Sequence, residues 1–440
     1  MRRPSTIAAR AALLFLIAPG AAAAQTSAPP PLDRSAAVRW LQDNSIPLRS
    51  FAPADTDYTD LAPLGAAIGG ARVVMLGEQS HGDGTVFLTK TRIIKYLHEK
   101  LGFEVLAFES GLYDVKKAWE FLREGEAPFT AVRRGVFGIW AGSQQVQPLI
   151  DYLGIRAKSD RPLELAGFDS QITGRVATEF WVRDLVSFLG AHGIDTAQVP
   201  GWTDGRALLD SLVTPAGFSQ GPPAEARQRL LLTVLDTVGA RVAALPPADR
   251  ETAFWKQNLR SIRAQAAFAF NLDLKRFRPS AGNPRDAQMA ENLLWLARER
   301  YPDKKIIVWA ATFHIMRSTE TIGIPVYQGL RTMGDILGPV LGKEMYAIGF
   351  VASQGAVGSW MGPPRTLPAP PPESLEGMWA STTHALAMID FRGQLSDAGW
   401  LRQPILAGPL GYSILPAAWP TVLDAMIYTR VMEPSTKATR

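Results

Sequence analysis

The chain has 440 residues, of which 47% are hydrophobic and 20% are charged, and it contains no cysteine. These proportions are those of a globular protein with a large buried core. The lack of cysteine excludes disulfides, thiolate-bound metals, iron–sulfur clusters and a cysteine nucleophile. The sequence has no cluster of Lys and Arg interleaved with aromatic residues, so we expect no nucleic-acid partner.

The first 24 residues have the pattern of a secretory signal peptide. Three arginines precede an apolar run over residues 11–18, and the alanines at 22–24 offer a cleavage site after Ala24. The apolar run is shorter than the roughly 20 residues that a membrane-spanning helix needs, although an uncleaved amphipathic anchor is an alternative. Removing these residues lowers the net charge from +5 to about +2, because they hold three arginines and no acid. We therefore expect a periplasmic or secreted protein with no membrane span after signal cleavage.

The mature chain is expected to begin with a disordered Ala/Pro-rich segment over residues 25–35, followed by a single domain over residues 36–440. After a helical and loop-like region, short apolar strands alternate with helices, which predicts an α/β fold with a mostly parallel sheet covered on both faces. Strands are predicted at 72–76, 104–108, 163–168, 305–310 and 345–351, with later candidates at 387–391 and 425–428, and helices at 85–101, 115–123 and 147–158.

Two further segments interrupt this alternation. Residues 224–245, 250–271 and 284–300 are predicted helices, so we expect a large α-helical insertion or lid subdomain over about 198–300. Residues 353–376 are rich in Gly and Pro and are expected to form a surface loop near the mouth of the site.

Polar side chains capable of proton transfer follow four of the predicted strands. Ligands of an open parallel sheet bind beyond the carboxyl ends of its strands, so these side chains are expected to form one site. The first strand is followed by Glu78 and His81, the second by Glu109, the third by Asp169 and the fourth by His314.

The pair Glu78 and His81 is the strongest candidate for catalysis. Glu78 directly follows an apolar strand, and a buried carboxylate must find a partner or take up a proton. An imidazole such as that of His81 can accept a proton from water or an alcohol. Either Glu78 or Glu109 could fix its tautomer, and Gly77, Gly82 and Gly84 are expected to give the loop unusual conformations close to a ligand.

Structural roles are the alternatives for these residues. Glu78 could cap the following helix, Glu109 could be an ion-pair partner, and His314 could be a core histidine. Asp169 is expected to be structural rather than catalytic. The other three histidines are given no role: His98, expected on a solvated helix face, and His192 and His384, in loop-like stretches.

Two competing motifs point to other chemistry. Residues 217–221 match the G-x-S-x-G pattern of serine hydrolases, but Thr214-Pro215 precedes them and Pro222-Pro223 follows them where a strand and a helix are required, which predicts a loop. A metal site is the second alternative, since Glu78, His81, Glu109 and His314 have side chains that bind zinc or manganese. The H-E-x-x-H helix signature is absent, and the spacing leaves this alternative open.

The segment Gly77-Glu78-Gln79-Ser80-His81-Gly82 resembles the G-E-x-x-H-G signature of the erythromycin esterase family. The resemblance spans roughly residues 65–430, with its motifs in order. It continues through Lys90 and Arg92, 106–109, 167–169, Arg285-Asp286, 289–292, Trp309-Ala310, His314-Ile315 and 423–427.

This resemblance implies a three-layer α/β/α core with added helices, and an enzyme that needs no cofactor. Family members that act on macrolides hydrolyse the lactone ester without a serine nucleophile, using the signature histidine to activate water. That role corresponds to His81, while Glu78, Glu109 and His314 match the other family positions. His314 or Arg92 would polarise the carbonyl or stabilise the oxyanion. The supporting or substrate-binding residues would be Arg92, Asp169, Arg285, Asp286 and Asn292.

The chain departs from the family where His-Asn often precedes the last histidine, because Ala311 and Thr312 stand there. The loss of these polar groups predicts a different substrate or a weaker oxyanion site. We therefore expect hydrolysis of a small-molecule ester or lactone, with macrolide cleavage and antibiotic resistance as its most specific form. The alternatives are a metal-dependent peptide hydrolase and a non-catalytic haem- or small-ligand-binding protein.

Overall fold

The computed structural model describes residues 32–215, 217–218, 221–246, 249–271, 283–393 and 398–439. The predicted signal peptide, with its cleavage site, and residues 25–31 lie outside these ranges. The predicted disordered segment 25–35 extended too far, because helix α2 (Arg34–Asn44) begins inside it. Asp33 caps this helix by accepting from the backbone N–H of Ala36, and Leu32 packs against the core.

The core is a mostly parallel sheet, as the alternation of strands and helices predicted. Six neighbouring strands run parallel in the order β11-β6-β2-β5-β3-β4, and β8 and β1 extend the sheet antiparallel beyond β11. The strands are β1 (Ile46–Pro47), β2 (Val73–Leu76), β3 (Phe103–Gly111), β4 (Glu164–Asp169), β5 (Lys305–Trp309), β6 (Met345–Val357), β8 (Leu386–Asp390) and β11 (Ala425–Met432).

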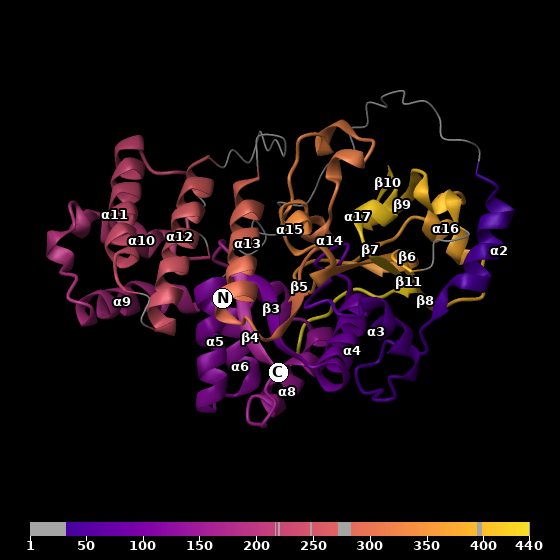
Figure 1. Cartoon of the computed structure of the whole chain (residues 1–440), viewed down its shortest axis with the longest axis horizontal. Helices are drawn as coiled ribbons and strands as arrows, with labels where there is room; N and C mark the ends of the chain where they lie inside the picture. The colour runs from indigo at the N-terminus through magenta and orange to yellow at the C-terminus, as the bar shows by residue number, and fades with distance from the viewer. Residues whose placement is uncertain are drawn as a thin grey trace.

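Helices cover both faces of this sheet, which gives the predicted three layers (Figure 1). Alternate residues of a strand point to opposite faces, and in β2 Val73 and Met75 enter one hydrophobic cluster while Val74 and Leu76 enter the other. One layer holds α3 (Ala62–Ile68), α4 (Gly84–Leu101) and α8 (Gln147–Arg156), and the other holds α13 (Pro284–Trp295), α15 (Met333–Leu341) and α16 (Leu375–Ala380).

The helices between β4 and β5 form a block beside the sheet. In Figure 1, α9 to α12 stand beyond the β4 edge, and α13 returns over the sheet. Packing of α13 on β4 places α13 in the core layer rather than in the block. The boundaries 198–300 of the insertion stay a prediction. The block consists of α9 (Val176–Ala191), α10 (Trp202–Leu212), α11 (Glu225–Ala243) and α12 (Arg250–Asn271).

Shorter elements complete the end of the molecule that carries the polar strand ends. The predicted loop 353–376 is partly regular, because β6 continues to Val357 and pairs with β7 (Arg365–Thr366). A two-stranded hairpin that the sequence did not predict follows β8. The remaining elements are α5 (Leu112–Glu124), α6 (Pro128–Gly135), α7 (Gly138–Ala141), α14 (Thr312–Ile315), β9 (Ile405–Leu410), β10 (Ser413–Ala417) and α17 (Trp419–Val422).

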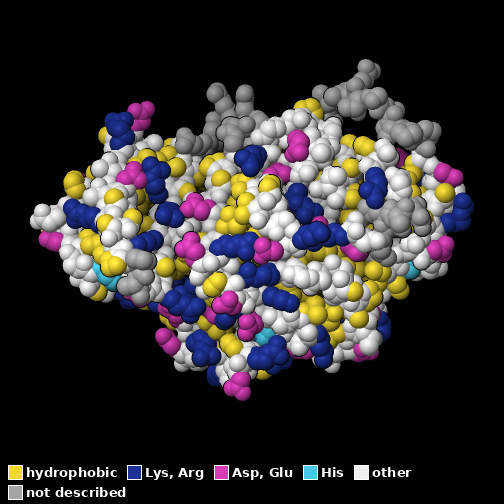
Figure 2. Space-filling view, viewed as in Figure 1, with side chains coloured by type: hydrophobic (Ala, Val, Ile, Leu, Met, Phe, Trp, Pro, Cys, Tyr) yellow, Lys and Arg dark blue, Asp and Glu magenta, His cyan; other side chains and the backbone are white. Residues whose placement is uncertain are grey.

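The outer surface carries both signs of charge. On the face in Figure 2, Lys and Arg side chains are interspersed with Asp and Glu side chains. None of the helices in the described ranges combines the length and apolar character needed to cross a membrane.

Candidate active site

The carboxyl ends of β2, β5, β3 and β4 lie side by side, because these strands are consecutive in the sheet and parallel. The polar residues predicted to follow them are joined by hydrogen bonds and ion pairs into two adjacent groups. One group is centred on Glu78 and the other on Glu109. The structure therefore brings together the residues that the sequence placed at the strand ends.

Glu78 is fully buried and has a partner for each oxygen. Its Oε1 lies 3.2 Å from Nδ1 of His81 and accepts from Nε1 of Trp140 at 2.9 Å. Its Oε2 pairs with Nζ of Lys90, which is also fully buried. The alternative role of Glu78 as a helix cap is wrong, because α4 begins after Asp83.

His81 packs against two aromatic rings. Its ring lies edge-on to Trp140 and to Phe137, with centroid distances of 5.1 Å and 6.2 Å, and its side chain is 12% exposed. A carboxylate facing Nδ1 favours the tautomer with its proton on that atom. In that tautomer Nε2 is the basic nitrogen.

The glycines around His81 serve close packing rather than unusual backbone conformation. None of Gly77, Gly82 and Gly84 has a positive φ. A Cβ at Gly77 would lie 2.5 Å from Oγ1 of Thr312, and one at Gly82 would lie 2.5 Å from the carbonyl carbon of Gly358. The unusual backbone conformation expected of these glycines was therefore wrong, and their close approach to a ligand stays a prediction. Gly82 does place the predicted 353–376 segment beside the His81 loop.

Glu109 anchors the second group. Its Oε1 accepts from Nη2 of Arg285 at 2.9 Å and lies 3.2 Å from Nε2 of His314, while its Oε2 accepts from the backbone N–H of Ala311 at 2.8 Å. Burial acts to raise the pKa of this carboxyl, but the charges of His314 and Arg285 outweigh it and hold the pKa below its usual range. Glu109 is therefore ionised.

His314 is buried between two carboxylates. Its Nδ1 lies 2.7 Å from Oδ1 of Asp286, and its Nε2 faces Glu109. Burial lowers the pKa of the imidazole, but Asp286 and Glu109 together raise it to about 10. His314 is thus a core histidine, but a charged one at neutral pH. The contact of 3.4 Å between its Nε2 and Nη1 of Arg285 then joins two donors and is not a hydrogen bond.

Arg285 is the cation of this group that reaches the surface of the site. It binds Asp169 through Nε at 3.1 Å and Nη2 at 2.6 Å, and its side chain is 11% exposed. Burial lowers its pKa, but the charges of Asp169 and Glu109 outweigh this and hold the pKa above its usual range. Asp169 therefore orients Arg285. Asn292 lies behind this pair and donates to the carbonyl of Phe168 at 2.9 Å, which ties α13 to the end of β4.

Arg92 is not part of either group. Its guanidinium pairs with Asp60 at 2.7 Å and donates to the carbonyls of residues 50, 55 and 57. It therefore anchors the segment before α3.

His98 is buried, and its Nδ1 lies 2.6 Å from Oη of Tyr152, so the solvated position expected for it was wrong. Burial and Arg156 lower the pKa of His98 to about 4.

The sequence did not single out Trp140, Asp83 or Tyr412. Asp83 accepts from the backbone and hydroxyl of Ser80 and from Oη of Tyr412 at 2.9 Å. Tyr412, with φ +64°, lies at the tip of the β9–β10 hairpin, where Gly411 N–H donates to the carbonyl of Gln79. The hairpin therefore clamps the His81 loop. No spacing rule marks the contacts of the hairpin with this loop, because they join segments more than 300 residues apart.

The structure bears differently on the two competing motifs, the G-x-S-x-G segment and the metal site. Ser219 and Gln220 of the G-x-S-x-G motif lie outside the described residues, and α10 rather than a strand precedes Gly217. Across the described ranges, no three His, Asp or Glu side chains are grouped so as to hold a metal ion. Glu78 and His314 each already face oppositely charged or hydrogen-bonding partners within the protein.

Comparisons with known proteins point to one family. The model of the family described as erythromycin esterase matches residues 98–432, a range that begins after the His81 loop. A Bacillus subtilis protein named as an inferred hydrolase, YbfO, is 28% identical over 420 residues. The match covers 90% of this chain and 91% of that protein. An Escherichia coli erythromycin esterase type II is 42% identical over 72 residues, which are 16% of this chain and 17% of that protein.

Solved structures show the same fold. A Bacillus cereus protein matches with a TM-score of 0.76 at 20% identity, covering 93% of this chain and all of that one. A mutant erythromycin esterase in its open conformation matches with a TM-score of 0.64 at 18% identity, covering 87% of this chain and 96% of that one. These structures establish the α/β/α architecture.

Proposed function

Because the chain belongs to the erythromycin esterase family, a family of hydrolases, we propose that it cleaves an ester or lactone of a small molecule with water activated by His81. The observation that carries this proposal is the contact between His81 Nδ1 and Glu78 Oε1 at 3.2 Å. Lys90 and Trp140 hold the carboxylate in place, and the His81 side chain remains partly exposed.

His81 is the proposed general base. Its Nε2 takes a proton from water while the water oxygen forms a bond to the carbonyl carbon, which gives a tetrahedral intermediate. The carboxylate of Glu78, paired with Lys90, stabilises the imidazolium that forms, as a carboxylate does beside a catalytic histidine. When the intermediate collapses, the bond to the alcohol oxygen breaks and the imidazolium returns the proton to that oxygen. The products are a carboxylic acid and an alcohol.

Arg285 is the proposed oxyanion-stabilising group. It is cationic, it is 11% exposed against 1% for His314, and Glu109 and Asp169 fix its guanidinium. Preorganised donors of this kind stabilise the negative charge that develops on the carbonyl oxygen. His314 acts through Glu109, whose carboxylate it holds in place. This assignment replaces Arg92, whose donors are bound to Asp60 and nearby carbonyls.

The substrate is proposed to be an ester or lactone, with macrolide lactones as the most specific candidates. Ala311 has no polar side chain, and its backbone N–H is bound to Glu109. The Oγ1 of Thr312 is buried, with no hydrogen-bond partner among the described residues, and it lies against Gly77. Ala311 offers no side-chain donor and the hydroxyl of Thr312 is buried, so we propose a preference for esters that need fewer polar contacts.

The test is an assay of the purified chain against p-nitrophenyl esters, small lactones and 14-membered macrolides, with and without a chelator. We expect hydrolysis that the chelator leaves unchanged and that Arg285→Lys lowers about 100-fold, in the range for one oxyanion donor. Arg298→Lys, on the surface, is the control. Activity that a chelator removes and zinc or manganese restores would overturn the metal-free mechanism. Absence of hydrolysis across the panel would overturn the esterase proposal.

We also propose that residues 1–24 direct export and are removed after Ala24. The arrangement of basic, apolar and small residues in the sequence supports this. Mass spectrometry of the protein from fractionated cells tests it, and we expect a periplasmic or secreted species that starts at Gln25. A cytoplasmic species that retains Met1 would contradict export.

A further inference from the structure

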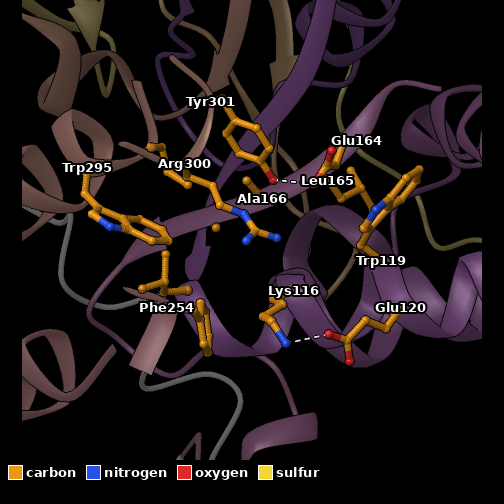
Figure 3. Close-up of a pocket in the computed structure, with 13 residues that line it drawn as sticks. Lys116, Trp119, Glu120, Glu164, Leu165, Ala166, Phe254, Trp295, Arg300 and Tyr301 are labelled. Atoms are coloured by element: carbon orange, nitrogen blue, oxygen red, sulfur yellow. Dashed lines mark hydrogen bonds and ion pairs between the residues drawn. The ribbon is translucent and has the colours of Figure 1, made fainter. Parts of the chain in front are cut away.

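A cavity of about 120 Å³ lies at the β4 edge of the sheet (Figure 3). Its walls come from α5, the first half of β4, α12 and the turn that follows α13. None of the active-site side chains lines it. On β4 the lining ends at Gly167, two residues before Asp169 of the active site, which is roughly 7 Å at the usual rise of a strand. The cavity is therefore close to the active site but has its own lining.

Two cationic side chains extend into this cavity, as Figure 3 shows for Lys116 and Arg300. Lys116 is balanced by Glu120 at 2.5 Å and by Glu251 at 3.3 Å. Arg300 has no ion pair with any Asp or Glu side chain in the described part of the chain, and its guanidinium lies 5.7 Å from the centre of the Tyr301 ring. Arg300 is thus the cation of the cavity that lacks a counter-charge.

The acidic residues of the cavity wall are already engaged elsewhere. Glu164 accepts from Oη of Tyr301 at 2.5 Å and pairs with Lys304 at 3.3 Å. Glu120 pairs with Lys117 at 2.7 Å in addition to Lys116. Neither carboxylate is paired with Arg300, but both make the wall unfavourable for a ligand with two or more negative charges.

Aromatic rings supply the rest of the lining. Trp295 and Phe254 form one wall, with centroids 6.4 Å apart and planes at 58°, and Trp119 lies opposite them (Figure 3). An engineered cavity of about 150 Å³ is known to hold benzene. The present cavity, at about 120 Å³, is somewhat smaller, so a single six-membered ring is the largest ring system that it fits, with Trp295 and Phe254 placed for edge-to-face contact.

The backbone that presents Arg300 is unusual. Residues Leu296–Arg300 form a π-helical turn, a conformation that is rare and often found at functional sites. The turn closes with the N–H of Tyr301 donating to the carbonyl of Leu296 at 2.8 Å. Within the same turn Arg298 is 42% exposed and pairs with Glu344, whereas Arg300 enters the cavity.

We propose that this cavity binds a small monocyclic aromatic carboxylate, with its carboxylate on Arg300 and its ring against the wall that Trp295 and Phe254 form. The planar guanidinium matches a carboxylate with two parallel hydrogen bonds. The single negative charge of the ligand supplies the missing counter-charge without excessive repulsion from Glu120 and Glu164. Nothing in this assignment depends on the ester-hydrolase proposal.

The probe is benzoate, and the measurement is isothermal titration calorimetry on the full chain. We expect saturable one-to-one binding that is weaker for acetate, which lacks the ring, and for benzyl alcohol, which lacks the charge. Arg300→Met should weaken benzoate binding about tenfold or more, as expected for a lost charged hydrogen bond. Arg298→Met, from the same turn, should change it less than twofold.

Two further variants keep the test decisive. Arg300→Lys retains the charge but loses the planar fork, so it should also weaken benzoate binding. It replaces Arg300→Met if circular dichroism shows that Arg300→Met does not fold. Benzoate is also a product-like acid for an ester hydrolase, so Arg285→Lys controls for binding in the active site. Binding that Arg285→Lys weakens and the Arg300 variants spare would overturn the proposal, as would the absence of saturable benzoate binding.

Discussion

Trp140 donates its indole Nε1–H to Oε1 of Glu78 at 2.9 Å, the same oxygen that lies 3.2 Å from Nδ1 of His81. One carboxylate oxygen therefore serves both the candidate base and a buried tryptophan. The tryptophan ring also packs edge-on against His81, with centroids 5.1 Å apart. Trp140 is thus a positioning residue that acts on His81 directly and through Glu78.

Trp140→Phe should lower kcat about tenfold, the lower end of the effect of losing a supporting hydrogen bond to a site residue. KM should change little, because Trp140 is fully buried. The matched control is Trp379→Phe, which removes a buried indole hydrogen bond of equal length, to Ser45 Oγ at 2.9 Å, on α16. Steady-state kinetics measure both. Equal losses of kcat in the two variants would contradict a positioning role for Trp140.

Lys90→Met should destabilise the fold by about 3–5 kcal/mol, because it leaves Glu78 buried without its counter-charge. The double variant Lys90→Met, Glu78→Gln should recover much of that stability, since no buried charge is left unpaired. It should remain inactive, because the partner of His81 is no longer ionised. Urea denaturation of the single and double variants measures this coupling, and additive losses of stability would show that the pair is not coupled.

Stability should fall as the pH rises from about 6.5 to about 10, through the titration of His314. The pKa of His314 is raised in the folded state to about 10, because Asp286 and Glu109 outweigh burial. A raised pKa stabilises the fold below the unfolded pKa, and that contribution, on the order of a few kcal/mol, is lost towards the folded pKa. His314→Gln should be less stable at pH 7 and should show a flatter dependence. Urea denaturation at several pH values measures this, and an equal dependence of the free energy of unfolding on pH in wild type and variant would refute the prediction.

Tyr412→Phe should destabilise the protein more at pH 8 than at pH 5. Burial raises the pKa of Asp83 to about 6, so its carboxylate is mostly protonated at pH 5 and ionised at pH 8. The contribution of Asp83 to stability is therefore lost as the pH rises from about 4 to about 6. Removing the Tyr412 hydroxyl takes a donor from the ionised form, which should cost about 1–3 kcal/mol at pH 8. A pH-independent loss in urea denaturation would contradict this.

The architecture could be predicted because it depends on local patterns. The strand over residues 73–76 is apolar at every position, as a strand buried on both faces must be, and Gly102 marks the end of α4 with φ +71°. The apolar strand patterns also placed Glu78, Glu109, Asp169 and His314 at strand ends. Because these strands are parallel, their carboxyl ends meet at one edge of the sheet and bring the four residues together. Local order along the chain was sufficient for these features.

The partners of the site residues could not be predicted, because they come from distant segments. Arg285 reaches Glu109 across 176 positions, and Tyr412 reaches Asp83 across 329. Arg92 lies on α4, as the family pattern suggested, but its guanidinium turns toward Asp60 rather than toward the site. A sequence motif fixes where a side chain starts, whereas packing decides what that side chain contacts.

The most direct test of the account is kcat/KM of His81→Asn relative to wild type, on the best ester or lactone of the panel. His192→Asn is the control, since His192 lies at the end of α9 with its Nδ1 against the carbonyl of Phe188. A general base contributes about 10²–10⁴-fold, so His81→Asn should lose at least about 100-fold while His192→Asn stays near wild type. A folded His81→Asn variant that retains activity within threefold of wild type would contradict the central claim that His81 activates water.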